Sequence, residues 1–177
     1  FEVAKLSWAR PGPTGWWTEG VPGQAFKVTV QCGSGPEGGF VTFLEAGAPS
    51  YELRGQDIAG VFVKVVGDAG SARHMSVPAD VSALSDSVAM IESWVHAVPK
   101  GSAVLLALVG VAPGSLARIL AALSPLGVPV QAPTVSCAAL AAVGVRPEAG
   151  AYQAGSWFST HASSDVAYAT MALQKPF

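Results

Sequence analysis

The three histidines are the residues of this chain best suited to acid–base chemistry, so their neighbours decide whether catalysis is expected. A nucleophilic mechanism needs a nucleophile beside a base, with a third group orienting that base. His74 falls in a predicted strand, His96 at the end of a predicted helix and His161 in a Gly- and Ser-rich stretch. The chain contains no G-x-S-x-G motif. We therefore predict surface or helix-capping roles for the histidines and no catalytic residue.

Metal sites are not indicated either. Zinc needs cysteine and histidine ligands in short pairs, and neither Cys32 nor Cys137 has such a neighbour. Calcium needs alternating oxygen ligands, and no acidic run of that kind occurs. We predict no metal and no cofactor. The two cysteines, with their apolar neighbours, are interpreted as small buried hydrophobes, and a single bridge between them stays open.

Two glycine-rich turns could be taken for anion-binding loops. The turn GSGPEGG lacks the Lys and Ser or Thr that touch phosphate and magnesium, and it joins two predicted strands, so a hairpin turn is favoured. The turn GVAPGS joins a strand to a helix, and its free backbone donors could hold an anion. Water is the more common occupant of such turns and is expected here.

Aromatic residues in Gly-rich surroundings are the remaining candidates for ligand binding. Exposed aromatic side chains stack on sugar rings or fill pockets of a partner protein. The alternative is that they pack against the domain or against neighbouring copies, which we expect for Trp8 and Trp94. The predicted ligand-binding residues are Trp16, Trp17, Tyr152, Trp157 and Phe158.

Composition excludes two classes of protein. Of the 177 residues, 50% are hydrophobic and only 12% are charged, which excludes a disordered tail. Ten Lys plus Arg against twelve Asp plus Glu give a net charge of -2 without a basic run, so nucleic acid is not an expected partner. The length suits a single domain.

A long apolar region raises the question of a membrane span. Between Gly101 and Val145 the only charged residue is Arg118. A spanning helix needs about 20 uninterrupted apolar residues, and no Lys or Arg cluster flanks this region. We predict the interior of a soluble fold with no membrane span. The residues that interrupt the run are Gly110, Pro113, Gly114, Pro125 and Pro129.

The elements that must position these residues begin after an N-terminal arm or linker, residues 1–24. Residues 9–24 are rich in Pro and Gly, which disfavours a packed element there. The segment AFKVTVQC alternates apolar and polar residues, the period of a half-buried strand. With FVTFLEAG it predicts a hairpin over residues 25–46. Residues 25–177 are predicted to form one domain.

The middle of the chain predicts two strands and a helix. Strands at 61–66 and 71–77 are joined by the turn Gly-Asp-Ala-Gly at 67–70. Pro78 and Asp80 suit the first turn of the helix that follows, and Pro99 and Gly101 its end. The apolar stripe of this helix is Val81, Leu84, Val88, Ile91 and Val95.

The rest of the chain continues the alternation of strand and helix. SAVLLALVG is a continuous apolar run, typical of a strand covered on both faces. Ser115 is predicted to cap a second helix, which ends at Gly127 and Pro129. Residues 138–145 are predicted as strand, with helix left open, and another strand is expected near 166–173. The buried side of the second helix is predicted to carry Leu116, Ile119, Leu120 and Leu123.

Several short motifs, in the order of the predicted elements, resemble those of the interleukin-like EMT-inducer (ILEI) domain, also called the GG domain. Gly60 with VKVVGDAG matches a glycine before a "VVV-D-x-x-G" hairpin, and WVHAVPKG matches a helix ending in "I-x-x-I-P-x-G". ILAALSPLG matches a helix closed by "L-x-x-L-G". Arg146 lies near where the lysine of a later "W-x-x-x-G-x-K-G" phrase belongs. The resemblance covers roughly residues 38–150.

The resemblance implies a fold and a range of functions. The implied fold is α+β: a sandwich of small, mostly antiparallel sheets with two or three short helices. Members of the family include secreted cytokine-like proteins, the sugar-recognising stem of a glycosyltransferase, and appendages of bacterial and phage surface or tail proteins. Two cysteines do not reproduce the disulfides of the secreted vertebrate members, which favours a bacterial or phage member.

Two functions are therefore expected. The first is a non-catalytic recognition or structural module on an extracellular or virion surface, such as a phage tail or fibre. There it would bind a glycan, a receptor or another surface protein, or neighbouring copies of an assembly. The alternative is a small α/β enzyme such as a hydrolase, which the series of strands and helices from Ser71 onward permits.

Overall fold

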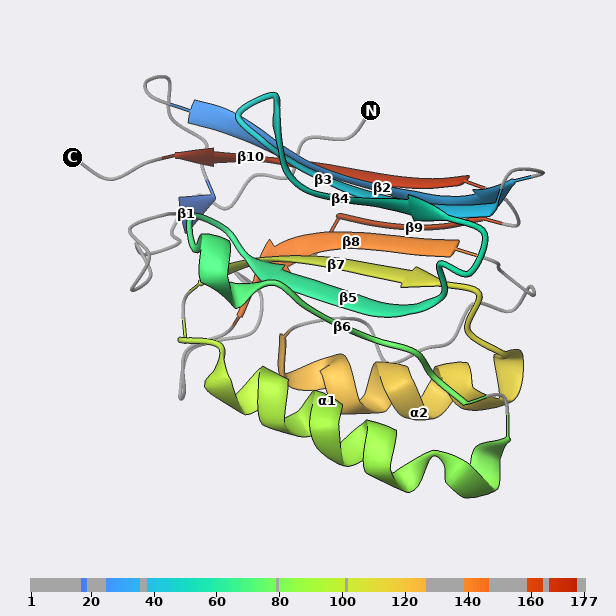
Figure 1. Ribbon diagram of the computed structural model, residues 1–177. Coiled ribbons are helices and arrows are strands. Elements are labelled where there is room, and N and C mark those ends of the chain that lie inside the picture. Colours follow the sequence, from blue (N-terminus) through green and yellow to red (C-terminus); the bar gives the residue numbers. More distant parts are fainter. Residues whose placement is uncertain are drawn as a thin grey trace.

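Two five-stranded sheets lie face to face, and two helices cover the far side of the second sheet (Figure 1). The described pairings of both sheets are antiparallel, so the predicted class, an α+β sandwich of small sheets with short helices, is confirmed. The computed structural model describes residues 17–18, 25–35, 38–78, 80–100, 102–126, 139–146, 159–163 and 166–174.

The first sheet has the strand order β1-β10-β2-β3-β4. The predicted hairpin is confirmed in β2 and β3, and the strand expected near 166–173 is confirmed in β10. Two strands were not predicted: β4, and the two-residue β1 inside the segment interpreted as a loop or linker. The strands are β1 (Trp17–Thr18), β10 (Val166–Gln174), β2 (Ala25–Gly35), β3 (Gly38–Glu45) and β4 (Ala48–Gly55).

The second sheet has the order β6-β5-β7-β8-β9. The strands predicted at 61–66 and 71–77 form an antiparallel pair, but the second is shorter than predicted, because Ala69–Ser71 form a 3-10 helix and β6 is limited to Arg73–Met75. The segment at 138–145 is a strand and not a helix. Its last strand, β9, was not predicted. The strands are β6 (Arg73–Met75), β5 (Gly60–Val65), β7 (Ala103–Val109), β8 (Ala139–Val145) and β9 (Ser159–Ser163).

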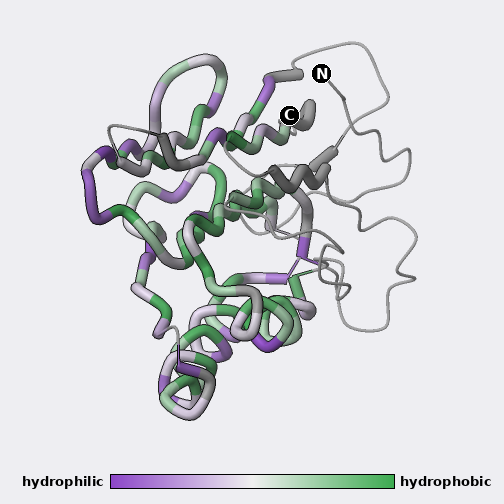
Figure 2. Tube along the Cα trace, turned by 90° about the vertical axis from the view of Figure 1, so that its right-hand side faces the viewer, coloured by the Kyte–Doolittle hydropathy of each residue, from purple (hydrophilic) through white to green (hydrophobic). Residues whose placement is uncertain are grey.

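The central strands β5 and β7 of the second sheet are buried on both faces, as the apolar run at 102–110 predicted for β7. All seven residues of β7 are buried, and they contribute alternately to two cores. Phe62 of β5 faces the first sheet, whereas its neighbours Val61 and Val63 face the helices. Figure 2 shows the hydrophobic segments between the layers. Burial on both faces explains why this part of the sequence lacks a polar alternation.

The two helices are α1 (Ser85–Ala97) and α2 (Pro113–Leu123). Ile91 and Val95 of α1 are buried against the second sheet, as the predicted stripe requires. The helix begins later than Pro78 and Asp80 suggested, because a separate 3-10 turn (Val81–Ala83) precedes it. The predicted buried side of α2 is confirmed at Leu116, Ile119, Leu120 and Leu123.

The predicted cap of α2 is wrong. The capping residue is Ala112, and Pro113 opens the helix, where its fixed φ and missing N–H are tolerated. Ser115 lies inside the first turn, fully buried, and its hydroxyl donates to the Pro78 carbonyl oxygen at 3.1 Å. The serine therefore ties α2 to the segment that leads into α1.

A buried ion pair joins the two sheets at one end of the sandwich. Lys64 of β5 donates to Glu45 of β3 at 2.5 Å, and the two side chains are 3% and 14% exposed. The other carboxylate oxygen of Glu45 accepts the backbone N–H of Gly67 at 2.8 Å. Both charges are thus satisfied inside the protein, as burial requires.

Two further expectations concern the burial of the cysteines and the question of a membrane span. Cys32 is fully buried between the sheets, as interpreted, and its Sγ lies 3.3 Å from the Leu140 carbonyl oxygen. Cys137 lies outside the described residues. Neither α1 nor α2, the helices that the structure describes, has the length and apolar character that crossing a membrane takes.

Candidate functional site

The five aromatic residues predicted to bind ligand lie outside the described side chains. Trp17 has a described backbone, in β1 opposite Gln174 of β10. Trp16, Tyr152, Trp157 and Phe158 are outside the described ranges altogether. A binding site at these residues stays a prediction.

The histidines lie on separate strands and a helix. His74 is exposed on the edge strand β6, and its ring stacks on Phe62 with centroids 5.4 Å apart. His96 is exposed in the last turn of α1, and His161 lies in β9 opposite Ala141. In the described part of the chain, no three His, Cys, Asp or Glu side chains are grouped to hold a metal ion.

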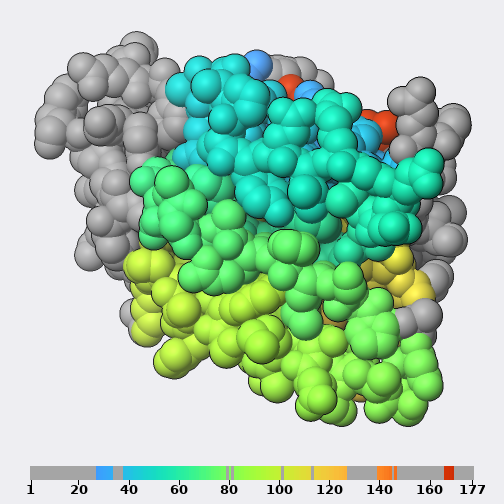
Figure 3. All heavy atoms as spheres, in the orientation of Figure 1, coloured from blue at the N-terminus to red at the C-terminus, as the bar shows by residue number. Residues whose placement is uncertain are grey.

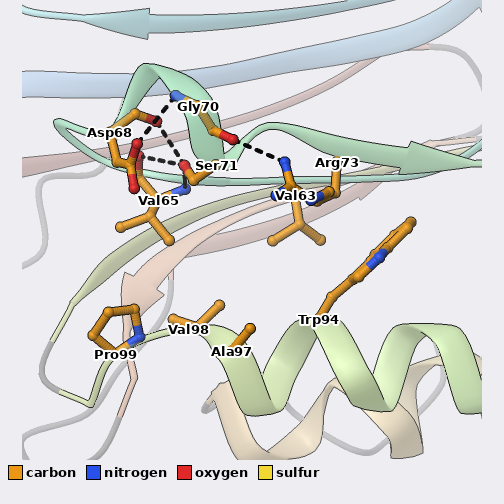
Figure 4. A pocket seen from close by; sticks show the side chains of 10 residues that line it. All are labelled: Val63, Val65, Asp68, Gly70, Ser71, Arg73, Trp94, Ala97, Val98 and Pro99. Carbon is orange, nitrogen blue, oxygen red and sulfur yellow. Dashed lines mark hydrogen bonds between the residues drawn. The ribbon is translucent and has the colours of Figure 1, made fainter.

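A pocket of about 300 Å³ lies between the β5–β6 turn and the C-terminal end of α1 (Figure 4). Apolar side chains form two opposing walls, Val63 and Val65 from β5 and Val98 with Pro99 after α1. Sequence reasoning did not find this pocket, because it is built from segments that are some thirty residues apart. Its polar and aromatic members are Asp68, Ser71, Arg73 and Trp94.

Local hydrogen bonds shape the upper wall. The Ser71 hydroxyl donates toward the carbonyl oxygens of Asp68 at 2.6 Å and Val65 at 3.2 Å, and it accepts the Val65 N–H. One carboxylate oxygen of Asp68 accepts the Gly70 N–H at 3.0 Å. These bonds occupy the serine hydroxyl and hold the exposed carboxylate of Asp68 at the rim, so Asp68 is the group available as an acceptor.

Arg73 brings a cation to the same pocket. One guanidinium nitrogen donates to the carbonyl oxygens of Gly70 at 2.8 Å and Ala72 at 2.9 Å. A guanidinium carries five N–H donors, so these two bonds position the group without exhausting it. The pocket thus offers an acceptor and a donor set of opposite charge.

Trp94 closes one side of the pocket. Its indole rises from α1 on the side of the pocket where Arg73 lies in Figure 4. The expectation that Trp94 packs is confirmed, since it is half-buried against the core on the helix side of the second sheet. It also lines the pocket, a role that the helical pattern of the sequence did not suggest.

Arg146 supports the lower wall from behind. Its guanidinium donates to the carbonyl oxygens of Val95 at 2.5 Å, His96 at 3.4 Å and Val98. These carbonyls lie in the last turn and C-cap of α1, the negative end of the helix, where a cation is favoured. Arg146 therefore holds the residues after α1 that form the wall opposite β5.

The arrangement suits binding better than chemistry. An indole face and apolar walls accommodate a ring, while one carboxylate and one guanidinium can hydrogen-bond to hydroxyl groups at its edge. The one hydroxyl in the lining, that of Ser71, is already engaged in local hydrogen bonds.

Comparison with known proteins gives no family for this chain. No protein-family model matches it, and no curated protein sequence matches it. Function must therefore be argued from the site.

Proposed function

We propose that this protein is a non-catalytic recognition module that binds a glycan in the pocket beside Trp94. The observation that carries the proposal is the combination of an indole, a rim carboxylate and a guanidinium around one pocket of about 300 Å³. This volume is at the lower end of the range for small-molecule sites, which suits one terminal sugar unit.

The chemistry of a sugar matches these groups. The C–H face of a pyranose ring is apolar and packs on an aromatic ring, whereas its hydroxyls both donate and accept hydrogen bonds. Asp68 would accept from two neighbouring hydroxyls, and Arg73 would donate to a ring or hydroxyl oxygen. Because Asp68 and Arg73 have opposite charges, the pocket favours a neutral sugar over a charged one.

The setting proposed for this module is an extracellular or virion surface. The low charge and the motifs shared with GG domains support this setting, including a phage tail or fibre protein. The partner there would be a glycan, free or carried on a surface protein. Trp16, Trp17, Tyr152, Trp157 and Phe158 would add contacts if they lie near a bound chain of sugars.

A glycan array with the parent protein and pocket variants tests the proposal. We expect Trp94→Ala and Asp68→Ala each to weaken binding about tenfold or more, since a central aromatic or charged contact is worth at least 1.4 kcal/mol or so. Asp68 is exposed, so its variant should fold even if Trp94→Ala does not. Met90→Ala, one turn away on α1 and exposed, is the matched control that should bind as the parent does.

Other results would contradict the proposed site. If no glycan binds, or if both pocket variants bind as tightly as the parent, the pocket is not a sugar site. If Trp16→Ala and Trp157→Ala abolish binding while the pocket variants retain it, the aromatic residues predicted from the sequence form the site instead.

A further inference from the structure

Strand β4 is the longest edge strand among the described residues. It pairs with β3 on one side, and no described strand pairs with its other side. The remaining edge strands are shorter: β1 has two residues, β6 three and β9 five, against eight in β4. An edge strand presents unpaired backbone N–H and C=O groups that can bind another strand.

The outer side of β4 is accessible. Residues 48–50, Glu52 and Arg54 are exposed, and the segment lies uncovered at the front of the molecule in Figure 3. Tyr51 and Leu53 alternate with these residues and are half-buried on the core side. Strand β4, whose outer edge is unpaired, therefore has an apolar face toward the core and a charged face toward solvent.

The charged face of β4 carries two opposite charges two residues apart. Glu52 and Arg54 form an exposed ion pair at 2.8 Å, with side chains 42% and 68% exposed. Like charges on an edge repel a second copy of the strand, which is a common protection against pairing. Opposite charges two residues apart instead attract a second copy, in the register that places each Glu opposite an Arg.

We propose that β4 pairs with β4 of a second copy of this chain, antiparallel, about a two-fold axis at Leu53. In that register Glu52 lies opposite Arg54 of the second copy, and the same pair forms again on the other side of the axis. Residues directly opposite in an antiparallel pair have Cβ atoms about 4.5–5.5 Å apart, close enough for both ion pairs. The first sheet of one copy and the first sheet of the other would then form one continuous sheet.

The two neighbouring registers on the same strand fit worse. An axis at Glu52 places that carboxylate against its own copy, and an axis at Arg54 does the same for the guanidinium. With the axis at Leu53, Tyr51 lies opposite Gly55, which leaves room for the aromatic ring on the core side. Pro49 then falls outside the paired segment 51–55, so its missing N–H removes no bond within it.

The association does not depend on the sugar pocket, whose lining residues belong to β5, the turn after it, β6, α1 and the residues just after α1. Exposed ion pairs contribute little each, so the dimer should form with rising protein concentration and weaken with salt. The same two-fold arrangement would present two pockets at once, which raises the avidity for a surface that carries many copies of a ligand.

Charge reversal at Glu52 and at Arg54 tests the proposed register, with the molecular mass in solution as the measurement. We expect the parent, followed by sedimentation or light scattering over a concentration series, to shift from 18.0 kDa to twice that mass. Glu52→Arg alone and Arg54→Glu alone place like charges opposite each other and should remain monomeric. An equimolar mixture of the two variants should dimerise again, because each Arg then meets a Glu of the other variant.

A charge reversal outside β4 serves as the control. Glu92→Arg, on the exposed side of α1, changes the net charge as Glu52→Arg does and should dimerise like the parent. A parent that stays at 18.0 kDa throughout the series overturns the proposal, as does a dimer that survives both single reversals. Circular dichroism confirms that each variant is folded. Failure of the mixture to dimerise, with both variants folded, also overturns it.

Discussion

At the scale of single residues, backbone geometry at Gly60 limits what the β5–β6 hairpin can tolerate. Its φ is +127°, a region that residues with a side chain rarely adopt. A Cβ placed there would lie 1.9 Å from the Met75 carbonyl oxygen. A glycine at this position is thus required by the close approach of two strands.

We predict that Gly60→Ala destabilises the protein by at least about 1–3 kcal/mol, from the strained φ alone, with the contact to Met75 adding to this cost. The matched control is Gly47→Ala, where φ is also positive at +81° but a Cβ would meet nothing within 4 Å. Urea unfolding of both variants measures the difference. Equal losses at the two positions would show that the contact with Met75 costs nothing.

The residue scale also explains why the pocket escaped prediction. Asp68 and Gly70 were predicted as residues of a tight turn, and they lie at the cap of, and inside, a short 3-10 helix between the two strands; Trp94 was predicted correctly as a packing residue. Each of these interpretations describes one residue in its own element. The pocket exists only because the turn after β5 lies opposite the end of α1, which no local pattern specifies.

At the scale of elements, the end of α1 depends on a residue from another part of the chain. Arg146 follows β8, and its guanidinium binds three carbonyl oxygens of the last turn, the most distant being that of Val95, 51 residues away in sequence. The helix has no basic side chain but His96 in its last turn. Arg146 therefore supplies the cation that the negative end of this helix favours.

We predict that Arg146→Ala costs about 1.5–3 kcal/mol of unfolding free energy, the range for hydrogen bonds to a charged group. It should also speed amide hydrogen exchange in the last turn of α1 and weaken any ligand bound beside Val98. Arg54→Ala, at an exposed position of β4 in the first sheet, removes the same charge far from the end of α1 in the fold and serves as the comparison. Unchanged exchange at 95–98 would contradict the role given to Arg146.

At the scale of the whole molecule, the pair Lys64–Glu45 joins the two sheets through their buried side. Removing one member of a buried pair leaves an uncompensated charge, whereas removing both is often nearly neutral. Because Glu45 is partly exposed and keeps its hydrogen bonds with Gly67 and Ser50, we predict that Lys64→Met costs less than the about 3–5 kcal/mol of a fully buried pair, and that Lys64→Met with Glu45→Leu recovers most of that loss. Arg54→Ala, which breaks the exposed pair with Glu52, should cost under about 1 kcal/mol.

Chemical denaturation of these variants at neutral pH provides the measurement. A double variant no more stable than Lys64→Met would mean that packing around Lys64, and not its charge, holds the sheets together at this end.

The same pair makes the stability of the sandwich sensitive to acid. Burial raises the pKa of Glu45, but the hydrogen bonds from Lys64, Ser50 and the Gly67 N–H, with the positive charge of Lys64, bring it below its ordinary value of 4.5. A carboxyl of this kind stabilises the fold fully above its unfolded pKa, and the contribution is lost as pH falls through the folded value.

We accordingly predict that the unfolding free energy of the parent falls as the pH drops below about 4.5, more steeply than that of Glu45→Gln. Denaturant titrations at several pH values between neutral and acid would measure both slopes. Parallel slopes for the two proteins would show that Glu45 does not titrate with folding.

The sequence by itself determined the types of the elements with long, regular hydrophobic patterns: the hairpin of β2 and β3, the stripe of α1 and the fully apolar β7. A buried face imposes its period on the residues that form it, so those elements can be identified without knowing their neighbours. Edge strands lack that signal, because β4 exposes most of its residues and β9 contains a single apolar residue, Ala162.

The tertiary structure decided everything that depends on contacts between distant segments. Ser115 does not cap α2 because the helix already begins at Pro113, and its hydroxyl instead donates to the Pro78 carbonyl oxygen, 37 residues earlier in the chain. Asp68 and Trp94 share a pocket because β5 and α1 belong to neighbouring layers. Contacts of this kind follow from how the layers are stacked. The stacking depends on the whole chain, so the hydrophobic periodicity of a single segment does not predict it.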